Sequence, residues 1–288
     1  MKYNKLSSFI LKIIAIVAMV FDHVGIMLMN YSINETLAYV FRAIGRLSLP
    51  LFMLMVVEGA IHTKSFAKYC LKLGIIGTII LVAQVVATYG FHYTIFAGNI
   101  FIDLLLGALM VKCLMNEKKG IKALAAIPLL IGVISFIFYS LDNVNDVISQ
   151  FFPFFLRPQY HIYSMFLVFG FYEAYNLSKI GFGVLGLDYE LYKDSPMDRM
   201  LTNAIQAGIL IFVTTVLYVI GLIYNTNIPQ FVFWDYPLQN FAMISSVFLL
   251  LYSGQRGYNA KWFQYGAYIF YPLHILLLYV IFISIFGL

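Results

Sequence analysis

The chain has 288 residues, of which 62% are apolar and only 11% are charged, whereas about a quarter of an ordinary soluble domain is charged. So few charges cannot cover the surface of a soluble protein of this length, and the composition therefore excludes soluble fold classes. The net charge of +5 is not gathered in a basic stripe with interleaved aromatic residues, so we expect no nucleic-acid partner.

Apolar runs of about twenty residues recur along the whole chain, and a run of this length spans the hydrocarbon core of a lipid bilayer as one α-helix. Transmembrane β-strands would instead alternate apolar and polar residues over about ten residues. The sequence therefore predicts an all-α, polytopic transmembrane helical bundle of about nine spans, in one integral membrane domain over residues 1–288. The predicted spans are residues 9–30, 38–60, 68–90, 98–116, 121–140, 158–176, 204–225, 237–253 and 262–286.

The first apolar run is predicted to stay in the protein as a membrane helix. Basic residues precede it, as in a secretory signal, but no small-residue cleavage site follows. Asp22 and His23 also interrupt the run, which a cleavable signal would not contain.

Two segments in the middle of the chain depart from the simple pattern of apolar spans. Two prolines in FFPFFLRPQYH predict a short re-entrant or interfacial piece over residues 147–157, which would need protein or water around it. The sizeable polar segment over residues 177–203 is predicted to be an amphipathic cytoplasmic loop. The sequence leaves open whether this loop is simply solvated or binds a ligand.

The charges between the predicted spans indicate the orientation of the chain. Every second connection between the predicted spans, beginning with the one after the first span, carries acidic residues or His92. These residues are Glu35, His92, Asp142, Asp146 and Asp235. By the positive-inside rule the amino terminus lies in the cytoplasm, the carboxyl terminus lies outside, and the number of spans is odd. Near the side of these acidic connections the only basic residues are Arg42, Arg46 and Arg157. The basic residues of the other connections fall on the opposite side: Lys2, Lys5, Lys64, Lys68, Lys118, Lys119, Lys122, Lys179, Lys193, Arg199, Arg256 and Lys261.

A few ionisable residues lie inside the predicted spans, where each costs free energy unless it lines a cavity or pairs with another group. Five of them share one depth, from the midplane to the outer half, when residues are counted along the helices. These five are Asp22, His23, Arg46, Asp103 and His274; the others are Arg42, Glu58 and Glu173.

Asp22 and His23 are neighbours, so on a helix they point about 100° apart and need separate partners. We expect Asp22 to pair with Arg42 or Arg46, and His23 to face a central cavity, where a neutral imidazole is suited to accept a proton. Buried salt bridges that only fix helix packing remain an alternative, as does a packing hydrogen bond from His274. A proton relay in a transporter would use the same residue types.

Common catalytic motifs are missing from the sequence. It contains no HExxH, no pair of CxxC motifs, no phosphate-binding glycine loop and no GxSxG. We therefore expect no metal site and neither a P-loop motor nor a serine hydrolase. The two cysteines, Cys70 and Cys113, fall near the cytoplasmic ends of predicted helices, where a disulfide is not expected.

Four segments together resemble the TraX family of membrane proteins, which is linked to amino-terminal acetylation of conjugative pilin and occurs widely in bacteria. The resemblance lies in the DH of the first segment, the GR and EG of the second, and the YPLH of the last. The segments are LKIIAIVAMVFDHVG at residues 11–25, IGRLSLPLFMLMVVEGAIHT at 44–63, LYSGQRG at 251–257 and FYPLHILLLY at 270–279.

The resemblance implies an acyltransferase of the bacterial cytoplasmic membrane. It would move an acetyl group from cytoplasmic acetyl-CoA to an amine or hydroxyl of an exported peptide or a cell-surface glycan. By position, His23 would be the catalytic base, and Asp22 and His274 would complete the catalytic group. Residues for substrate and acyl-CoA binding would be Arg42, Arg46, Glu58, Asp103, Arg256 and Lys261, the last two at the CoA phosphates.

Two other classes of function remain open. A proton-coupled secondary transporter or exporter would also use intramembrane histidines and carboxylates, but it would be expected to show inverted repeats, and none is visible in the sequence. A non-catalytic subunit of an assembly machine is the third possibility.

Overall fold

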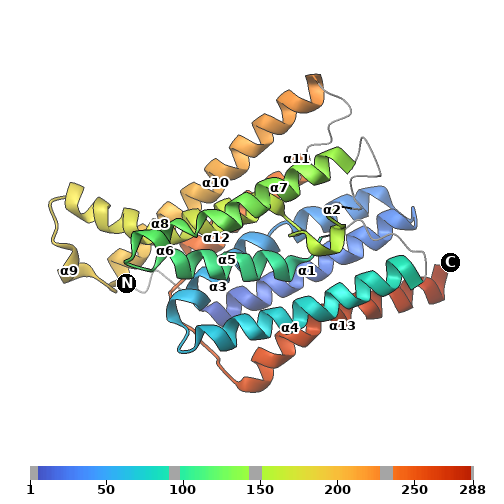
Figure 1. Ribbon diagram of the computed structural model, residues 1–288, viewed down its shortest axis with the longest axis horizontal. Coiled ribbons are helices and arrows are strands. Elements are labelled where there is room, and N and C mark those ends of the chain that lie inside the picture. The colour runs from blue at the N-terminus through green and yellow to red at the C-terminus, as the bar shows by residue number, and fades with distance from the viewer. Residues whose placement is uncertain (1–5, 91–97, 143–150, 228–235, 287–288) are drawn as a thin grey trace. The chain divides into compact units, whose positions relative to one another are not determined.

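The computed structural model describes residues 6–90, 98–142, 151–227 and 236–286. Within these ranges every element of secondary structure longer than a single bridge is a helix or a helical turn (Figure 1). An isolated bridge joins Leu6 to Tyr252. The elements are α1 (Ser8–Asn30), α2 (Glu35–Gly45), α3 (Ser48–His62), α4 (Phe66–Val85), the π-turn η1 (Val86–Gly90), α5 (Ile100–Leu114), α6 (Lys119–Ala123), α7 (Ala126–Asp142), the 3₁₀ turn η3 (Phe154–Leu156), α8 (His161–Val184), α9 (Tyr189–Tyr192), α10 (Pro196–Asn227), α11 (Tyr236–Gln239), the 3₁₀ segment η4 (Asn240–Ile244), α12 (Ser245–Leu250) and α13 (Lys261–Phe286).

Each predicted span coincides with a helix or a run of helices, which confirms the all-α class. Among the described residues, six helical stretches are long and apolar enough to cross a membrane, so the chain is a multi-pass membrane protein. The remaining predicted spans correspond to the 15-residue α5, to α8, and to the broken stretch α11–α12. The six stretches are Ser8–Asn30, Glu35–His62, Phe66–Gly90, Lys119–Leu141, Pro196–Ile223 and Lys261–Phe286. The count of nine and the cytoplasmic amino terminus stay predictions.

The segment over residues 177–203, predicted to be an amphipathic cytoplasmic connection, is largely helical. Helix α8 runs on to Val184, and α10 already begins at Pro196. The Asp198 carboxylate accepts hydrogen bonds from the Ser178 hydroxyl at 2.8 Å and from the Asp194 amide at 3.2 Å. Polar side chains inside this hairpin thus replace apolar packing, which is why hydropathy did not reveal its helices.

The region of the predicted re-entrant piece is only partly described. Residues 143–150 lie outside the described residues, and Phe154–Leu156 form a single 3₁₀ turn. Helix α8 then begins at His161, three residues after the predicted start of the sixth span.

The chain divides into two compact units. Unit 1 comprises residues 1–52, 173–218 and 236–288, and unit 2 comprises residues 53–172 and 219–235. Each unit is assembled from stretches far apart in the sequence, so neither is a domain that is continuous in the chain.

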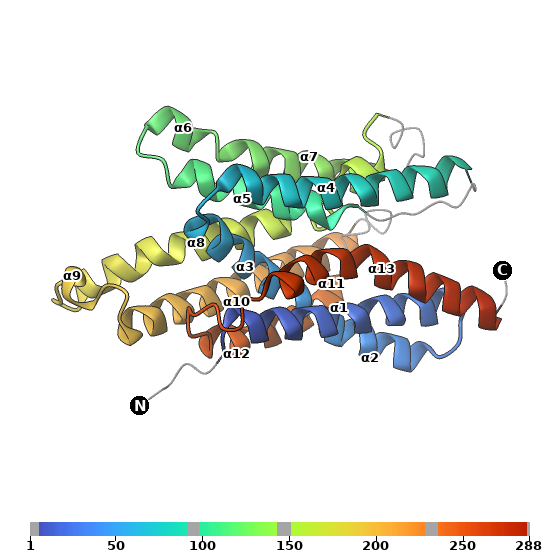
Figure 2. The same ribbon diagram turned by 90° about the horizontal axis from the view of Figure 1, so that it is seen from below.

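In unit 1, α1 and α13 run side by side in the same direction (Figure 2). At their amino-terminal ends the Phe9 ring packs against Phe263 at a centroid distance of 4.7 Å. At their carboxyl-terminal ends the Tyr31 ring packs against Phe282 at 5.7 Å. Two parallel first and last helices are what an odd number of spans requires.

Two glycines let α1 and α2 approach closely. A Cβ atom added at Gly25 would lie 2.7 Å from Cγ of Arg42, and one added at Gly45 would overlap the side chain of Asp22. These glycines bring the backbone of α2 against α1 at the level of the charged residues.

The predicted cytoplasmic segments of unit 1 lie together. The Leu6 amide donates to the Leu251 carbonyl at 3.0 Å, and the Ser8 amide donates to the Gln255 carbonyl at 2.8 Å. On α10, the Asn203 side chain donates to the Tyr252 carbonyl at 2.6 Å. The amino terminus of α1, the start of α10 and the loop before α13 therefore share one end of unit 1.

Unit 2 has an apolar core built by α3, α5 and α8. Gly107 of α5 lies against Val168 of α8, because a Cβ atom added there would be 3.0 Å from a methyl group of that valine. The fully buried side chains of this core include Met53, Leu54, Val57, Met110, Val111, Met165, Leu167 and Phe171.

Candidate functional site

The histidines of the DH and YPLH motifs, His23 and His274, form a hydrogen bond with each other in unit 1. Nδ1 of His23 on α1 lies 2.7 Å from Nε2 of His274 on α13. Nδ1 of His274 lies 2.8 Å from the carbonyl oxygen of Phe270, one turn earlier on the same helix. The Phe270 ring stacks on His274 with an angle of 8° between the planes, which holds that imidazole in place.

This chain of hydrogen bonds fixes the tautomer of both rings in their neutral forms. A carbonyl oxygen only accepts, so Nδ1 of His274 carries the proton and its Nε2 accepts. Nδ1 of His23 must then donate to His274, which leaves the lone pair of His23 on Nε2. Among the described residues this Nε2 has no hydrogen-bond partner, so His23 can accept a proton from a substrate.

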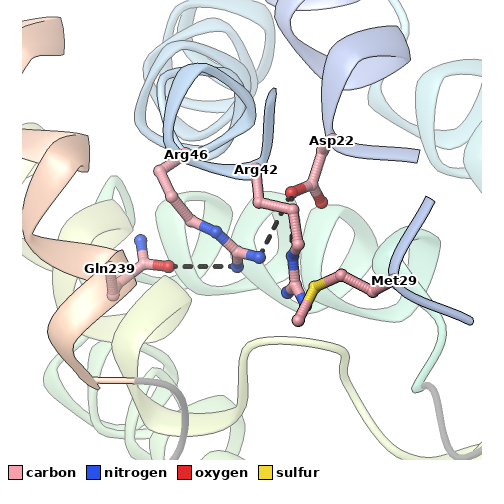
Figure 3. Close-up of polar contacts among 5 residues, drawn as sticks. All are labelled: Asp22, Met29, Arg42, Arg46 and Gln239. Carbon is pink, nitrogen blue, oxygen red and sulfur yellow. Dashed lines mark hydrogen bonds and ion pairs between the residues drawn. The ribbon is translucent and has the colours of Figure 1, made fainter. Parts of the chain in front are cut away.

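The predicted pairing of Asp22 with arginine is confirmed (Figure 3). Oδ1 of Asp22 lies 3.2 Å from an Nη atom of Arg46 and 3.7 Å from Nε of Arg42. Both arginines come from one turn of α2 and its carboxyl-terminal end. Their charges and that of the carboxylate act on the neighbouring His23 ring.

Two interrupted helices meet beside these charges. The stretch α2–α3 breaks at Arg46 and Leu47, and the Leu47 carbonyl accepts a hydrogen bond from the Ser245 hydroxyl at 3.0 Å. The stretch α11–α12 is interrupted by η4, and Gln239 just before it accepts from Arg46 at 3.4 Å. Interrupted helices at membrane depth are tolerated where protein or a water-filled cavity surrounds them.

The two residues predicted to bind CoA phosphates lie at the other end of α1. Gly254 and Gly257 adopt φ values of +72° and +70°, which only glycine adopts readily, and they turn the SGQRG loop onto α1. The Arg256 carbonyl accepts from the Phe9 amide at 3.1 Å, while its side chain is exposed. Lys261 is also exposed, at the first position of α13.

Further residues at this site were not singled out from the sequence. Lys12 on α1 lies close enough to Arg256 for the two charges to interact. The guanidinium of Arg199 lies over the ring of Tyr175 at 5.6 Å and over the ring of Tyr252 at 5.3 Å. In the sequence, Lys12 and Arg199 are isolated basic residues. Only their positions in the folded chain indicate a role at this site.

Glu58 and Asp103 belong to unit 2, and the structure shows local partners for both. Oε2 of Glu58 lies 3.2 Å from Nε2 of His62, one turn further along α3. The fully buried Asp103 accepts hydrogen bonds from the backbone amides of Gln159 and Tyr160, at 2.5 and 3.1 Å. A carboxylate beside the start of α8 stabilises that helix, which accounts for the burial of Asp103 without a ligand.

Within the described part of the chain, no group of three or more potential metal ligands occurs, and both cysteines are free thiols. Near His23 in unit 1, the ionisable residues form hydrogen bonds and ion pairs.

The comparison with protein families gives one match. The model described as TraX protein matches residues 7–182, which is more than half of the chain. The matched range contains Asp22, His23 and both arginines, and it ends before Gln239 and His274. No curated protein and no solved structure matches the chain.

Proposed function

Because the chain belongs to the TraX family, we propose that it is an integral membrane acyltransferase of the bacterial cytoplasmic membrane. The donor is cytoplasmic acetyl-CoA, and the acceptor is an amine or hydroxyl of an exported peptide or a cell-surface glycan. The observation that supports this proposal is the hydrogen-bond chain from Phe270 through His274 to His23, which leaves Nε2 of His23 as an unprotonated base.

In the proposed reaction, Nε2 of His23 removes the proton from the acceptor nitrogen or oxygen. That atom forms a bond to the carbonyl carbon of the thioester, and a tetrahedral oxyanion results. The carbon–sulfur bond then breaks, and His23 returns its proton to the departing CoA thiolate. The charges of Arg42 and Arg46 act on this region and favour the negative charge that develops on the oxyanion.

The position of the basic residues suggests how the donor lies. Arg256 contacts Phe9 at one end of α1, and His23 is fourteen residues further along, which is about 21 Å of helix. An extended pantetheine arm has a comparable reach. Phosphates of CoA bound by Arg256, Lys261 and Lys12 would therefore present the thioester to His23.

The proposal is tested by incubating purified protein in lipid nanodiscs with acetyl-CoA that is labelled in the acetyl group. We expect labelled products on lipid-extract or peptide acceptors, or slow release of labelled acetate when no acceptor is present. Label that stays on CoA under all these conditions would contradict the proposal.

A proton-coupled transporter is the second candidate, and the two interrupted helices that meet at Arg46 favour it. Transporters commonly place their substrate between interrupted helices. The two functions differ in what drives them, because acetyl transfer proceeds in nanodiscs without any gradient. Uptake into sealed proteoliposomes that depends on a proton gradient, with no acetyl transfer, would favour the transporter.

A further inference from the structure

Gln239 carries a buried hydrogen-bond donor that the protein does not use. Its exposed fraction is 4%, and its Oε1 accepts from Nη1 of Arg46 at 3.4 Å. A guanidinium only donates, so this contact fixes which end of the amide faces Arg46. Nε2 of Gln239 consequently points away from the arginine, as Figure 3 shows, and has no hydrogen-bond partner among the described residues.

The next residue carries a complementary group. Oδ1 of Asn240 is buried and also lacks a hydrogen-bond partner within the described ranges. Gln239 ends α11 and Asn240 begins the 3₁₀ segment η4, so the interrupted helix carries one such donor and one such acceptor on consecutive residues. Buried polar groups without partners are rare in proteins because they lose their hydration, and a pair of them indicates a site that another molecule fills.

The location ties this pair to the reacting groups. Arg46 binds Gln239 through one Nη atom and Asp22 through the other, and Asp22 precedes His23 in α1. A molecule that bonds to Gln239 therefore lies next to the residues of the proposed acetyl transfer.

We propose that Gln239 and Asn240 bind a secondary amide of the substrate. Nε2 of Gln239 donates to the carbonyl oxygen of that amide, and Oδ1 of Asn240 accepts its N–H. This assignment rests on the proposed acetyl transfer. Secondary amides occur in both substrates, in the pantetheine arm of acetyl-CoA and in a peptide or acetamido-sugar acceptor.

The test compares amide-bearing with amide-free substrates in two variants. Gln239→Glu keeps an oxygen toward Arg46 but replaces the N–H donor with a second oxygen and adds a negative charge, whereas Gln239→Leu removes both polar groups without adding a charge. The amide-free substrates measure the effect of the added charge. Donors are S-acetylpantetheine and S-acetyl-2-mercaptoethanol, which lacks an amide. Acceptors are a short peptide and a simple alkyl amine.

We expect Gln239→Glu to lower kcat/KM about tenfold more for the amide-bearing partner than for its amide-free counterpart, the usual effect of one lost hydrogen bond. If this additional fall in kcat/KM occurs only when the acetyl donor carries an amide, the amide that binds is that of pantetheine. If it occurs only when the acceptor carries an amide, the amide that binds is that of the peptide. If Gln239 only positions Arg46, each variant would change kcat/KM for amide-bearing and amide-free substrates alike, which would overturn the proposal.

Binding separates this proposal from the proposed function. Calorimetric titration of the wild type with pantetheine and with the peptide measures the amide site without any transfer. Binding that Gln239→Glu weakens, in a protein that transfers no acetyl group, would support the amide site and reject the acetyltransferase. No binding of either compound by a protein that does transfer acetyl groups would reject the amide site alone.

Discussion

At the scale of single residues, the bond between His23 and His274 decides which nitrogen of His23 can react. Here the Phe270 carbonyl and the stacked Phe270 ring hold His274, and His274 in turn holds His23. His274 is thus a positioning residue for the proposed base.

Replacing His274 with alanine should lower kcat about ten- to a hundredfold, because His23 loses the group that orients it, as with other partners that orient a histidine. The KM for acetyl-CoA should not change. His274→Gln retains an oxygen that can accept the Nδ1 proton of His23, so part of the rate should return. Steady-state kinetics on both variants measure this, and a wild-type kcat in folded His274→Ala would show that the bond only packs helices.

Asp22 is predicted to matter for stability as well as activity. Asp22→Asn keeps the shape of the side chain but leaves the buried Arg46 without its carboxylate. Breaking a buried ion pair from one side costs about 3–5 kcal/mol. The melting temperature in detergent should fall clearly, and acetyl transfer should fall with it. A variant as stable as the wild type would mean that other groups neutralise Arg46.

At the scale of helices, the contact between α1 and α2 depends on glycine. Gly45→Ala should destabilise the protein by about 1–3 kcal/mol, because the added methyl group overlaps Asp22 and forces the helices apart. Gly208→Ala in α10 is the matched control, since no atom lies within 4 Å of its added Cβ atom. That change should be neutral or slightly stabilising. Thermal unfolding of both variants measures the difference, and equal melting temperatures would contradict the close packing.

The sequence predicted where helices lie but not where they break. Each predicted apolar run coincides with a helix or a run of helices, because hydropathy averages over about twenty residues. The same averaging hides the interruptions at Leu47 and in η4, which depend on single polar contacts such as Ser245 to Leu47. The pairing of Asp22 with arginine was predictable, since a buried carboxylate needs a cation nearby.

The partner of His23 could not be read from the sequence. A shared depth made a contact with His274 possible, but 251 residues separate the two, and only the packing of α1 beside α13 brings them together. The sequence did not single out Gln239 and Asn240, because uncharged amide side chains are common in helices. Only the structure shows that their polar atoms are buried without a hydrogen-bond partner among the described residues.

At the scale of the whole molecule, the orientation in the membrane rests on the distribution of charge. In unit 1, α1 and α13 are parallel, and the predicted cytoplasmic segments lie at the same end. Both observations agree with all these segments facing the same side of the membrane. The positions of the lysines and arginines predict which side faces the cytoplasm.

Cysteine labelling tests this orientation, after Cys70 and Cys113 are replaced with serine. A cysteine at Glu35 should react with an impermeant maleimide in intact cells. A cysteine at Lys193 should react only after permeabilisation, because its segment carries basic residues. The reverse pattern would invert the topology and place the SGQRG loop away from cytoplasmic acetyl-CoA.

The most direct measurement for the whole account is the rate of acetyl transfer by His23→Ala. Loss of a general base lowers the rate by about 10² to 10⁴. The variant loses one neutral, half-buried ring, so its melting temperature and its KM for acetyl-CoA should stay close to those of the wild type. The initial rate with labelled acetyl-CoA in nanodiscs should therefore fall at least a hundredfold in a folded protein that still binds the donor, whereas a rate equal to that of the wild type would contradict His23 as the base.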